Sequence, residues 1–343
     1  MTQPAAAEHT LWHSLMREAI ELSLSSDVFR SANPRVGCVI VDAGGTIVGR
    51  GWHRGAGTDH AEVMALKEAG QLAQGATAVV TLEPCAHTGR TGPCAAALAD
   101  AGIARVVYAC DDPFPPAAGG GDFLRAQGIE VISGVLADEA EHANRAWFHV
   151  RRTGRPLVTA KMAVSLDGRV ADASGGPTPI TGAAARAYAH AQRQVADAIV
   201  VGTGTVLADD PHLTARAPDG ELAVRQPLRV VVGCTPISPS SRVLDGAAES
   251  LVVPSRDLQE VMDALTERDV QHVILEGGPR LMAAFLEQGL VDEITWFVAP
   301  TLLGNGPIAL PPLPIPVEVQ VRAVSVVGED VLVEGVIGVH RDS

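Results

Sequence analysis

The sequence contains no apolar run long enough to cross a bilayer. Its apolar runs, such as Ala198–Val201, hold only a few residues, whereas a membrane-spanning helix needs about 20. The first residues, Met1–His13, lack a basic segment followed by an apolar one, so no secretory signal is expected. We therefore expect a cytoplasmic protein.

Cysteine is scarce, and the five cysteines lie far apart in the chain. An odd number of scattered cysteines in a long sequence is not typical of a secreted disulfide framework, so reduced thiols are expected. The five positions are Cys38, Cys85, Cys94, Cys110 and Cys234.

Basic residues are few, with 26 lysines and arginines against 40 aspartates and glutamates and a net charge of −14. Binding to a nucleic-acid backbone relies on lysine and arginine replacing counterions, so this balance favours a small-molecule partner over nucleic acid or membrane. A local basic pocket for an anionic substrate remains compatible with that charge. The sequence is also compatible with a homo-oligomer but does not specify one.

Two α/β domains are expected from the length of 343 residues and from the pattern of elements. Helical periodicity around 11–22 precedes a hairpin over 36–50, and short apolar strands then alternate with helical patterns up to a helix over 138–148. The basic, Pro/Gly-interrupted segment 151–156 marks a junction between domains over residues 1–150 and 156–343. The second domain repeats strands and helices and ends in an antiparallel ribbon over 294–339.

His60, Cys85 and Cys94 form a candidate zinc site in the first domain. One imidazole and two thiolates suit tetrahedral Zn²⁺ and leave a fourth position for water, as in catalytic sites. All three positions lie near expected helix starts, where the positive end of the helix favours a thiolate. The remaining three cysteines are expected to be buried as small apolar residues.

Glu62 is the candidate catalytic residue beside this site. Hydrolytic deamination needs a group that moves protons from water to the ring nitrogen and to the departing amine. Residues two apart on a regular helix point in different directions, so Glu62 and His60 share the site only if the helix start places both there. The alternative is a closed, structural zinc site with His87 as the fourth ligand.

The segment from His60 to Glu62, followed by Thr81–Cys94, resembles the riboflavin-pathway branch of the cytidine-deaminase superfamily. The wider superfamily brings its two cysteines three positions apart, whereas this chain separates them by nine with a His-Thr-Gly-Arg-Thr insert typical of that branch. Asn33–Gly37 also matches a segment of that family, with Ala32 where a proline is usual. The resemblance implies a cytidine-deaminase-like α/β/α layer for the first domain.

The second domain offers a weaker signal from its residues alone. His272–Pro279 reads as a strand, two glycines and a proline opening a helix, a bend at which backbone N–H groups can approach a phosphate. A plain tight turn is the equal alternative. No Gly-x-Gly-x-x-Gly follows a strand, so the standard dinucleotide-binding fingerprint is absent from the sequence.

Three segments, 165–169, 202–216 and 276–278, resemble the reductase domain of the bifunctional riboflavin biosynthesis (RibD) family, which implies a dihydrofolate-reductase-like fold. Carried over by motif, the resemblance implies NADPH contacts at Ala163, Thr205, Asp209, Gly277 and Gly278. It implies substrate contacts at Arg193, Leu213, Arg216 and Glu276. Arginine forks suit a phosphate, although a solvated salt bridge is the alternative for each.

The resemblance implies two consecutive reactions with Zn²⁺ and NADPH as cofactors. The first is hydrolytic deamination of 2,5-diamino-6-ribosylamino-4(3H)-pyrimidinone 5′-phosphate. The second is reduction of the ribose of 5-amino-6-(5-phosphoribosylamino)uracil to ribitol. The phosphorylated pyrimidine is then the small-molecule partner.

Three positions depart from the family pattern. Pro179 replaces a tryptophan expected beside NADPH, which predicts weaker or altered cofactor binding. Phe114 replaces an asparagine, and Gly120 stands where an arginine is expected, which predicts altered affinity for the deaminase substrate. Two alternatives therefore stay open: a deaminase whose second domain has lost its activity, and a zinc-stapled binding module without turnover.

Overall fold

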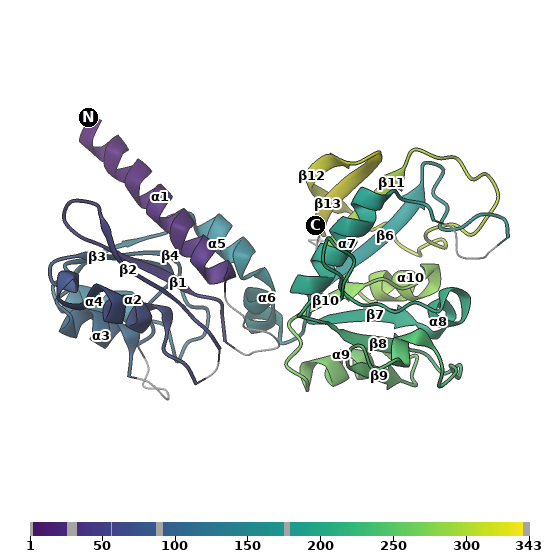
Figure 1. The fold of residues 1–343 in the computed structure, drawn as a ribbon, viewed down its shortest axis with the longest axis horizontal. Coiled ribbons are helices and arrows are strands. Elements are labelled where there is room, and N and C mark those ends of the chain that lie inside the picture. The colour runs from purple at the N-terminus through teal and green to yellow at the C-terminus, as the bar shows by residue number, and fades with distance from the viewer. Residues whose placement is uncertain (1–2, 26–32, 56, 87–91, 175–178, 339–343) are drawn as a thin grey trace. The chain divides into compact units, whose positions relative to one another are not determined.

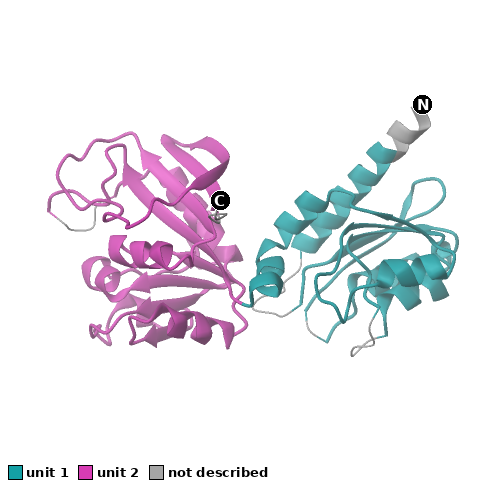
Figure 2. Ribbon diagram, turned by 180° about the vertical axis from the view of Figure 1, so that it is seen from behind, with its two compact units in different colours: residues 1–154 teal, residues 155–343 magenta. Residues whose placement is uncertain are grey.

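The computed structural model describes residues 3–25, 33–55, 57–86, 92–174 and 179–338. The chain divides into two compact units, residues 1–154 and 155–343 (Figure 2). Among the described residues, no helix is both long enough and apolar enough to cross a membrane.

The first unit is built on a five-stranded sheet with the order β2-β1-β3-β4-β5 (Figure 1). Strand β1 runs antiparallel to β2 and β3, whereas β3, β4 and β5 run parallel. The central strands are almost fully buried, as expected for apolar strands covered on both faces. The bounds are β1 Gly37–Val41, β2 Ile47–Trp52, β3 Thr77–Leu82, β4 Arg105–Cys110 and β5 Glu130–Ser133.

Helices cover both faces of this sheet and form an α/β/α layer. α1 (Gln3–Leu24) and α5 (Ala137–Ala143) contact each other on one face, and α2 (Ala61–Ala69), α3 (Cys94–Asp100) and α4 (Gly120–Ala126) line the other (Figure 1). A short 3-10 turn, η1 (Gly70–Ala73), follows α2. The layer therefore places the starts of α2 and α3 on the same face.

Glycines in the hairpin allow helix backbones to lie directly against the sheet. A Cβ at Gly37 would stand 1.9 Å from the Ala19 carbonyl oxygen, and one at Gly51 would stand 2.0 Å from the Ala61 carbonyl oxygen. Real Cβ atoms do not approach backbone this closely, so only glycine fits at either position. Gly51 thereby fixes where α2 begins.

The helix expected over 138–148 is instead two helices. α5 ends at Ala143, and α6 (Arg145–Thr153) starts after Asn144, whose backbone leaves the helical region. The Asn144 side chain accepts a hydrogen bond from the Arg35 backbone N–H at 2.9 Å, which offers an alternative to helix continuation. α6 runs on through Arg151 and ends at Thr153, with Gly154 as its C-cap, so the start of the expected junction is helical.

The second unit contains an eight-stranded mixed sheet with the order β12-β13-β11-β6-β10-β7-β8-β9. The strands from β11 to β9 are parallel, and β13 runs antiparallel to β11 and β12. The expected antiparallel ribbon is confirmed. The bounds are β6 Leu157–Ser165, β7 Ala198–Gly202, β8 Leu228–Val232, β9 Ser250–Val253, β10 His272–Leu275, β11 Glu293–Ala299, β12 Val319–Val327 and β13 Asp330–Ile337.

Helices pack on both faces of the second sheet. α9 (Leu258–Thr266) and α10 (Pro279–Glu287) bury their apolar side chains against one face, together with Met162. α7 (Ala183–Val195) and α8 (Thr203–Asp209) cover the other face, where Ala185 meets Phe297. A short 3-10 turn, η2, spans Arg242–Leu244. β9 and α8 are two elements that the periodicity of the sequence did not indicate.

We predict that Gly51→Ala destabilises the first unit by about 1–3 kcal/mol, because the new methyl group must displace the α2 backbone. The free energy of unfolding from urea titration measures this. Gly204→Ala is the control, since its Cβ meets nothing within 4 Å and lies in a helix. Equal stability of Gly51→Ala and the parent chain would contradict the close packing.

Candidate active sites

Three elements bring His60, Cys85 and Cys94 together. His60 is the N-cap of α2 with extended backbone angles, Cys94 is the first residue of α3, and Cys85 lies in the segment after β3. The backbone N–H of Cys94 donates to the Cys85 sulfur at 3.4 Å, so Cys85 faces the N-terminus of α3. The helix end thus stabilises negative charge on that sulfur.

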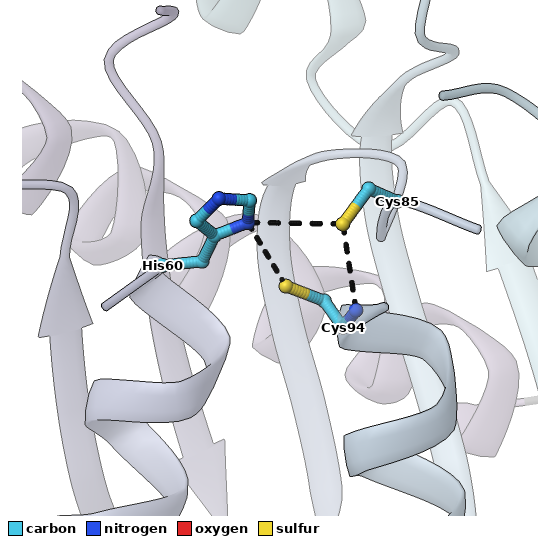
Figure 3. Close-up of side chains that lie close together, drawn as sticks. All are labelled: His60, Cys85 and Cys94. Atoms are coloured by element: carbon cyan, nitrogen blue, oxygen red, sulfur yellow. Dashed lines mark hydrogen bonds between the residues drawn. The ribbon is translucent and has the colours of Figure 1, made fainter. Parts of the chain in front are cut away.

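The three side chains form a compact set of metal donors (Figure 3). The His60 Nδ1 atom lies 3.1 Å from the Cys94 sulfur and 3.7 Å from the Cys85 sulfur, and all three donor atoms lie within 4.8 Å of one another. Tetrahedral zinc at its usual bond lengths separates its ligands by about 3.5 Å. The donor types and their spacing therefore fit zinc with three protein ligands.

The electrostatics of the cluster favour a thiolate. A hydrogen bond from the Cys94 side chain, together with the interaction with His60, lowers the pKa of Cys85 to about 4. The same hydrogen bond raises the pKa of Cys94. The arrangement therefore favours negative charge on Cys85, where a bound cation would stabilise it.

Glu62 lies in the first turn of α2 and is only 4% exposed. Its carboxyl group is within hydrogen-bonding reach of the Cys94 side chain. Burial, and then the negative charge of Cys85, raise the pKa of Glu62 to about 7. Because His60 is an extended N-cap residue, the divergence expected between positions two apart on a helix does not apply, and both side chains reach the cluster.

Other expectations for the first unit have mixed outcomes. His87, the alternative fourth ligand, lies outside the described residues. Cys38 and Cys110 are buried, as expected. The expectation was wrong for Cys234, which is exposed because it lies just beyond the buried strand β8, with its sulfur 3.6 Å from the Pro254 carbonyl oxygen.

A buried carboxylate, Glu83, holds the segment that borders the cysteines. Its two oxygens accept backbone N–H groups from Asp112 at 3.3 Å, Gly119 at 3.2 Å and Gly121 at 2.9 Å. Ala117 of that segment packs against the cluster cysteines. Sequence reasoning assigned Glu83 no role, and its place directly before Pro84 and Cys85 was the only signal.

The structure gives a steric reason for glycine at position 120. A Cβ there would stand 1.7 Å from the Pro84 carbonyl oxygen, so no side chain fits without moving the backbone. An arginine of the kind that the family resemblance implies is therefore incompatible with this local conformation. Phe114 is the other position in this unit that departs from the family pattern. It is 41% exposed, and the Arg151 guanidinium lies 5.4 Å from the centre of its ring.

His53 is a further residue near the cluster that sequence reasoning missed. It is buried, its ring centre lies 5.5 Å from that of His60, and its Nε2 atom lies 3.1 Å from the Asn33 side-chain nitrogen. Burial lowers the pKa of His53, which favours the neutral ring. Its position just after β2 carried no motif.

In the second unit, Arg193 and Glu276 form a buried, two-pronged ion pair. The Arg193 Nε and Nη2 atoms donate to the two Glu276 oxygens, both at 2.8 Å. Lys161 from β6 approaches Glu276 to 3.9 Å, a neighbour that sequence reasoning missed. Burial raises the pKa of Glu276, but Arg193 and Lys161 outweigh it and lower that pKa to about 2.

The residues expected to contact NADPH come from β6, from α8 and from the turn between β10 and α10. Thr205 in α8 accepts a hydrogen bond at 3.2 Å from the backbone N–H of Gly278, which is the N-cap of α10. This hydrogen bond connects α8, which also contains Asp209, to the turn formed by Gly277 and Gly278. At Gly277 an added Cβ would stand 2.9 Å from the Leu281 side chain, which would have to shift. Ala163 lies on β6, on the face covered by α7.

The remaining substrate-side residues lie along the segment after α8. Leu213 is buried with a φ of 54°, a backbone conformation unusual for leucine. The Thr214 carbonyl oxygen accepts a hydrogen bond from the Arg193 guanidinium at 3.1 Å. This bond connects the segment to the ion pair. The Arg216 guanidinium instead donates to the Gly220 carbonyl at 2.7 Å. Pro179, at the site of the missing tryptophan, is exposed.

Two family models divide the chain between them. Residues 10–110 match the cytidine and deoxycytidylate deaminase zinc-binding region, and residues 156–333 match the RibD C-terminal domain. The chain is thus a zinc-binding deaminase domain followed by a dihydrofolate-reductase-like reductase domain, which confirms the expected fold class.

Similar proteins agree along nearly the whole chain. Riboflavin biosynthesis protein RibD of Mycobacterium tuberculosis is 52% identical over 84% of this chain and 85% of its own length. RibD of Escherichia coli is 40% identical over 87% of this chain and 90% of its own. A Thermotoga maritima diaminohydroxyphosphoribosylaminopyrimidine deaminase/5-amino-6-(5-phosphoribosylamino)uracil reductase superposes with a TM-score of 0.87 and 32% identity, covering 96% of this chain and 100% of that one. The chain belongs to the RibD family.

We predict that Cys85→Ala abolishes retention of zinc after dialysis, because the ligand set falls from three to two. Metal content measured by atomic emission against protein concentration tests this. Cys110→Ala is the matched control, since Cys110 is also buried but its sulfur contacts the Ala137 carbonyl. Equal zinc in Cys85→Ala and Cys110→Ala would show that the cluster is not the binding site.

We also predict that Arg193→Ala destabilises the second unit by about 3–5 kcal/mol, because it leaves Glu276 buried without its partner. The lowered pKa of Glu276 stabilises the parent chain above the unfolded value of about 4.3, and this contribution is lost as the pH falls towards 2. Unfolding titrations across this pH range measure both effects. An unchanged acid dependence in Arg193→Ala would contradict the role of the pair.

Proposed function

We propose that this chain catalyses two consecutive reactions of riboflavin biosynthesis. The first is deamination of 2,5-diamino-6-ribosylamino-4(3H)-pyrimidinone 5′-phosphate, and the second is NADPH-dependent reduction of the ribose of 5-amino-6-(5-phosphoribosylamino)uracil. The observation that carries the proposal is the three-donor metal cluster with a buried carboxyl group beside it, in a chain whose other unit matches the RibD C-terminal domain.

In the deaminase reaction, His60, Cys85 and Cys94 would hold zinc. Zinc, when bound, supplies a Lewis acid that makes water a nucleophile near neutral pH. Glu62 would take one proton from the attacking water and give it to the ring nitrogen. It would then carry the second proton from the new hydroxyl group to the amine, which leaves as ammonia when the carbon–nitrogen bond breaks. Its burial beside Cys94 keeps this proton traffic away from bulk solvent.

In the reductase reaction, the groups around α8 and the start of α10 would hold NADPH. Ala163, Thr205, Asp209, Gly277 and Gly278 are the proposed cofactor contacts, and the Thr205–Gly278 hydrogen bond holds two of these segments together. NADPH supplies the hydride, so the protein's part is to bind and orient both reactants.

The substrate side of the reductase is proposed to consist of Arg193, Leu213, Arg216 and Glu276. The two-pronged bond between Arg193 and Glu276 occupies much of the arginine fork. Lys161 and Arg216 are therefore the cations that remain to bind the phosphate of the substrate. We propose a small phosphorylated pyrimidine as the partner, and no nucleic acid or membrane partner, because the chain is acidic.

One assay tests the two activities together. With the diaminopyrimidine phosphate, zinc and NADPH, purified protein should release ammonia and oxidise NADPH in equal amounts. Ammonia without NADPH binding or oxidation would instead select a deaminase with an inactive second domain, the alternative motivated by Pro179. Absence of both products would overturn the proposal.

Replacement of Glu62 by glutamine separates catalysis from metal binding. Glu62→Gln should lower the rate of ammonia release by about 10²–10⁴-fold, because the variant has no group to carry the proton. Zinc content should stay unchanged, since Glu62 is not one of the three donors. Reduction of the deaminated intermediate by the same variant is the internal control and should proceed at the parent rate.

A further inference from the structure

The segment that follows α8 has a strained backbone. Asp210 and Leu213 have φ angles of 40° and 54°, in the left-handed region that residues other than glycine rarely adopt. Both belong to the turn over 210–213, which separates Asp209, a proposed NADPH contact, from Arg216, a proposed substrate contact. Such strain persists only where the surrounding structure imposes it, and it is often found at ligand sites. The groups that impose it are therefore candidates for a functional role.

Arg229 holds this turn from inside the second unit. It lies on β8, is fully buried, and donates from its Nη1 atom to the His212 carbonyl oxygen at 3.1 Å. The same guanidinium donates to an Asp245 carboxylate oxygen at 2.9 Å and to the carbonyl oxygens of Arg242 and Ala248. Arg229 therefore connects the turn to the segment between β8 and β9.

That segment also contacts the turn directly, at two points. The Arg242 backbone N–H donates to the Asp210 carboxylate at 2.8 Å, and the His212 Nδ1 atom lies 2.8 Å from an Asp245 oxygen. Asp245 thereby contacts Arg229 through one oxygen and His212 through the other. The turn is thus fixed by contacts with its surroundings, which oppose the conformational preference of its own residues.

Leu213 lies between two arginines. The carbonyl oxygen of the residue before it, His212, accepts a hydrogen bond from Arg229. The carbonyl oxygen of the residue after it, Thr214, accepts one from Arg193 at 3.1 Å, and Arg193 belongs to the buried ion pair of the reductase site. The backbone around Leu213 is therefore held from both sides, and one of the two holding groups is part of the site itself.

The burial of Arg229 is not explained by stability alone. A buried ion pair must offset the cost of removing both charges from water, and apolar residues of similar volume often stabilise a protein as well or better. Val231, two positions further along β8 and on the same face, packs in an apolar core with Val206, Leu213 and Val243. A guanidinium at position 229 interrupts that face, and what it adds is a set of hydrogen bonds to the turn and its support.

We propose that Arg229 is a positioning residue of the reductase site. By holding His212, it keeps the turn over 210–213 in its strained conformation and so presents Leu213 and Arg216 to the phosphorylated substrate. Arg229 is fully buried, so it acts through the turn and not by contact with a reactant. The inference rests on the proposed reductase function, because Leu213 and Arg216 are proposed substrate contacts.

Steady-state kinetics of the full-length chain test the proposal. Arg229→Met keeps the apolar stem of the side chain and removes its donors. It should raise the KM for 5-amino-6-(5-phosphoribosylamino)uracil by about tenfold or more and change kcat less than about threefold, because the lost contacts bind ground state and transition state alike. A role in stability alone would lower kcat at an unchanged KM, since it reduces only the amount of active enzyme. Arg229→Lys keeps the charge beside Asp245 and should give an intermediate KM.

Hydrogen exchange measured by mass spectrometry gives a second readout, which does not depend on activity. Peptides spanning residues 210–216 should exchange about tenfold faster or more in Arg229→Met than in the parent chain. Peptides from β6 and β10 should keep the exchange rates of the parent chain, because the predicted change is confined to the turn. The deaminase reaction of the same variant should proceed at the parent rate.

Arg155→Met is the matched control. Arg155 forms a two-pronged ion pair with Asp292 at 2.8 and 2.6 Å, next to the start of β6 and so at the opposite end of that strand from Ala163. Arg155→Met thus removes a comparable ion pair from the same unit, away from the reductase site. It should keep the KM of the parent chain and the parent exchange rate over 210–216.

The outcomes separate this proposal from the proposed reaction. In a parent chain that reduces the uracil substrate, an unchanged KM or unchanged exchange over 210–216 in Arg229→Met would overturn the positioning role. The same changes in Arg155→Met would also overturn it. If circular dichroism shows that Arg229→Met is unfolded, Arg229→Lys decides by the same two measurements. A parent chain that does not oxidise NADPH with this substrate would instead overturn the proposed reductase reaction, and with it the site that Arg229 is proposed to position.

Discussion

Direct contact between backbones, made possible by glycine, is the constraint on which the deaminase site depends. At Gly51 and Gly120 the missing Cβ lets one segment lie within 2 Å of where a side-chain carbon would otherwise stand. The first contact fixes the start of α2, and with it His60 and Glu62. The second seats the start of α4 on the carbonyl of Pro84, directly before Cys85. The positions of two metal donors, His60 and Cys85, therefore depend on the absence of side chains at Gly51 and Gly120.

The two sites use buried charge differently. In the deaminase unit the acidic groups, Glu62 and the cysteines, face one another in a small volume, an arrangement that a divalent cation relieves. In the reductase unit the buried acid Glu276 is already neutralised by Arg193 and approached by Lys161. The acidic groups of the first site thus suit a bound metal ion, whereas the acid of the second site is paired with a side chain of the protein itself.

Much of this arrangement could be predicted from local sequence. His60, Cys85 and Cys94 have side chains whose chemistry is explicit, and their places at strand ends and helix starts bring them to one face of the sheet. The divergence of His60 and Glu62 expected for a regular helix was not an obstacle, because capping geometry replaced helical geometry there. Features that depend on contacts between distant parts of the sequence could not be predicted. The helix break at Asn144 depends on Arg35, 109 positions away, and Glu83 binds N–H groups that no spacing rule links to it.

The pairing of β12 with β13 shifts between Val321 and Ala323, so Arg322 is an extra, bulged residue in the strand. Because the side chains of a strand alternate, removal of Arg322 alone would carry Val324 and Val326 to the other face while leaving every valine in the sequence. The apolar content of the strand would be unchanged, yet the surface would be divided. A deletion of a single codon could thus change what this edge of the sheet presents to its surroundings, a change that comparison of composition alone would not detect.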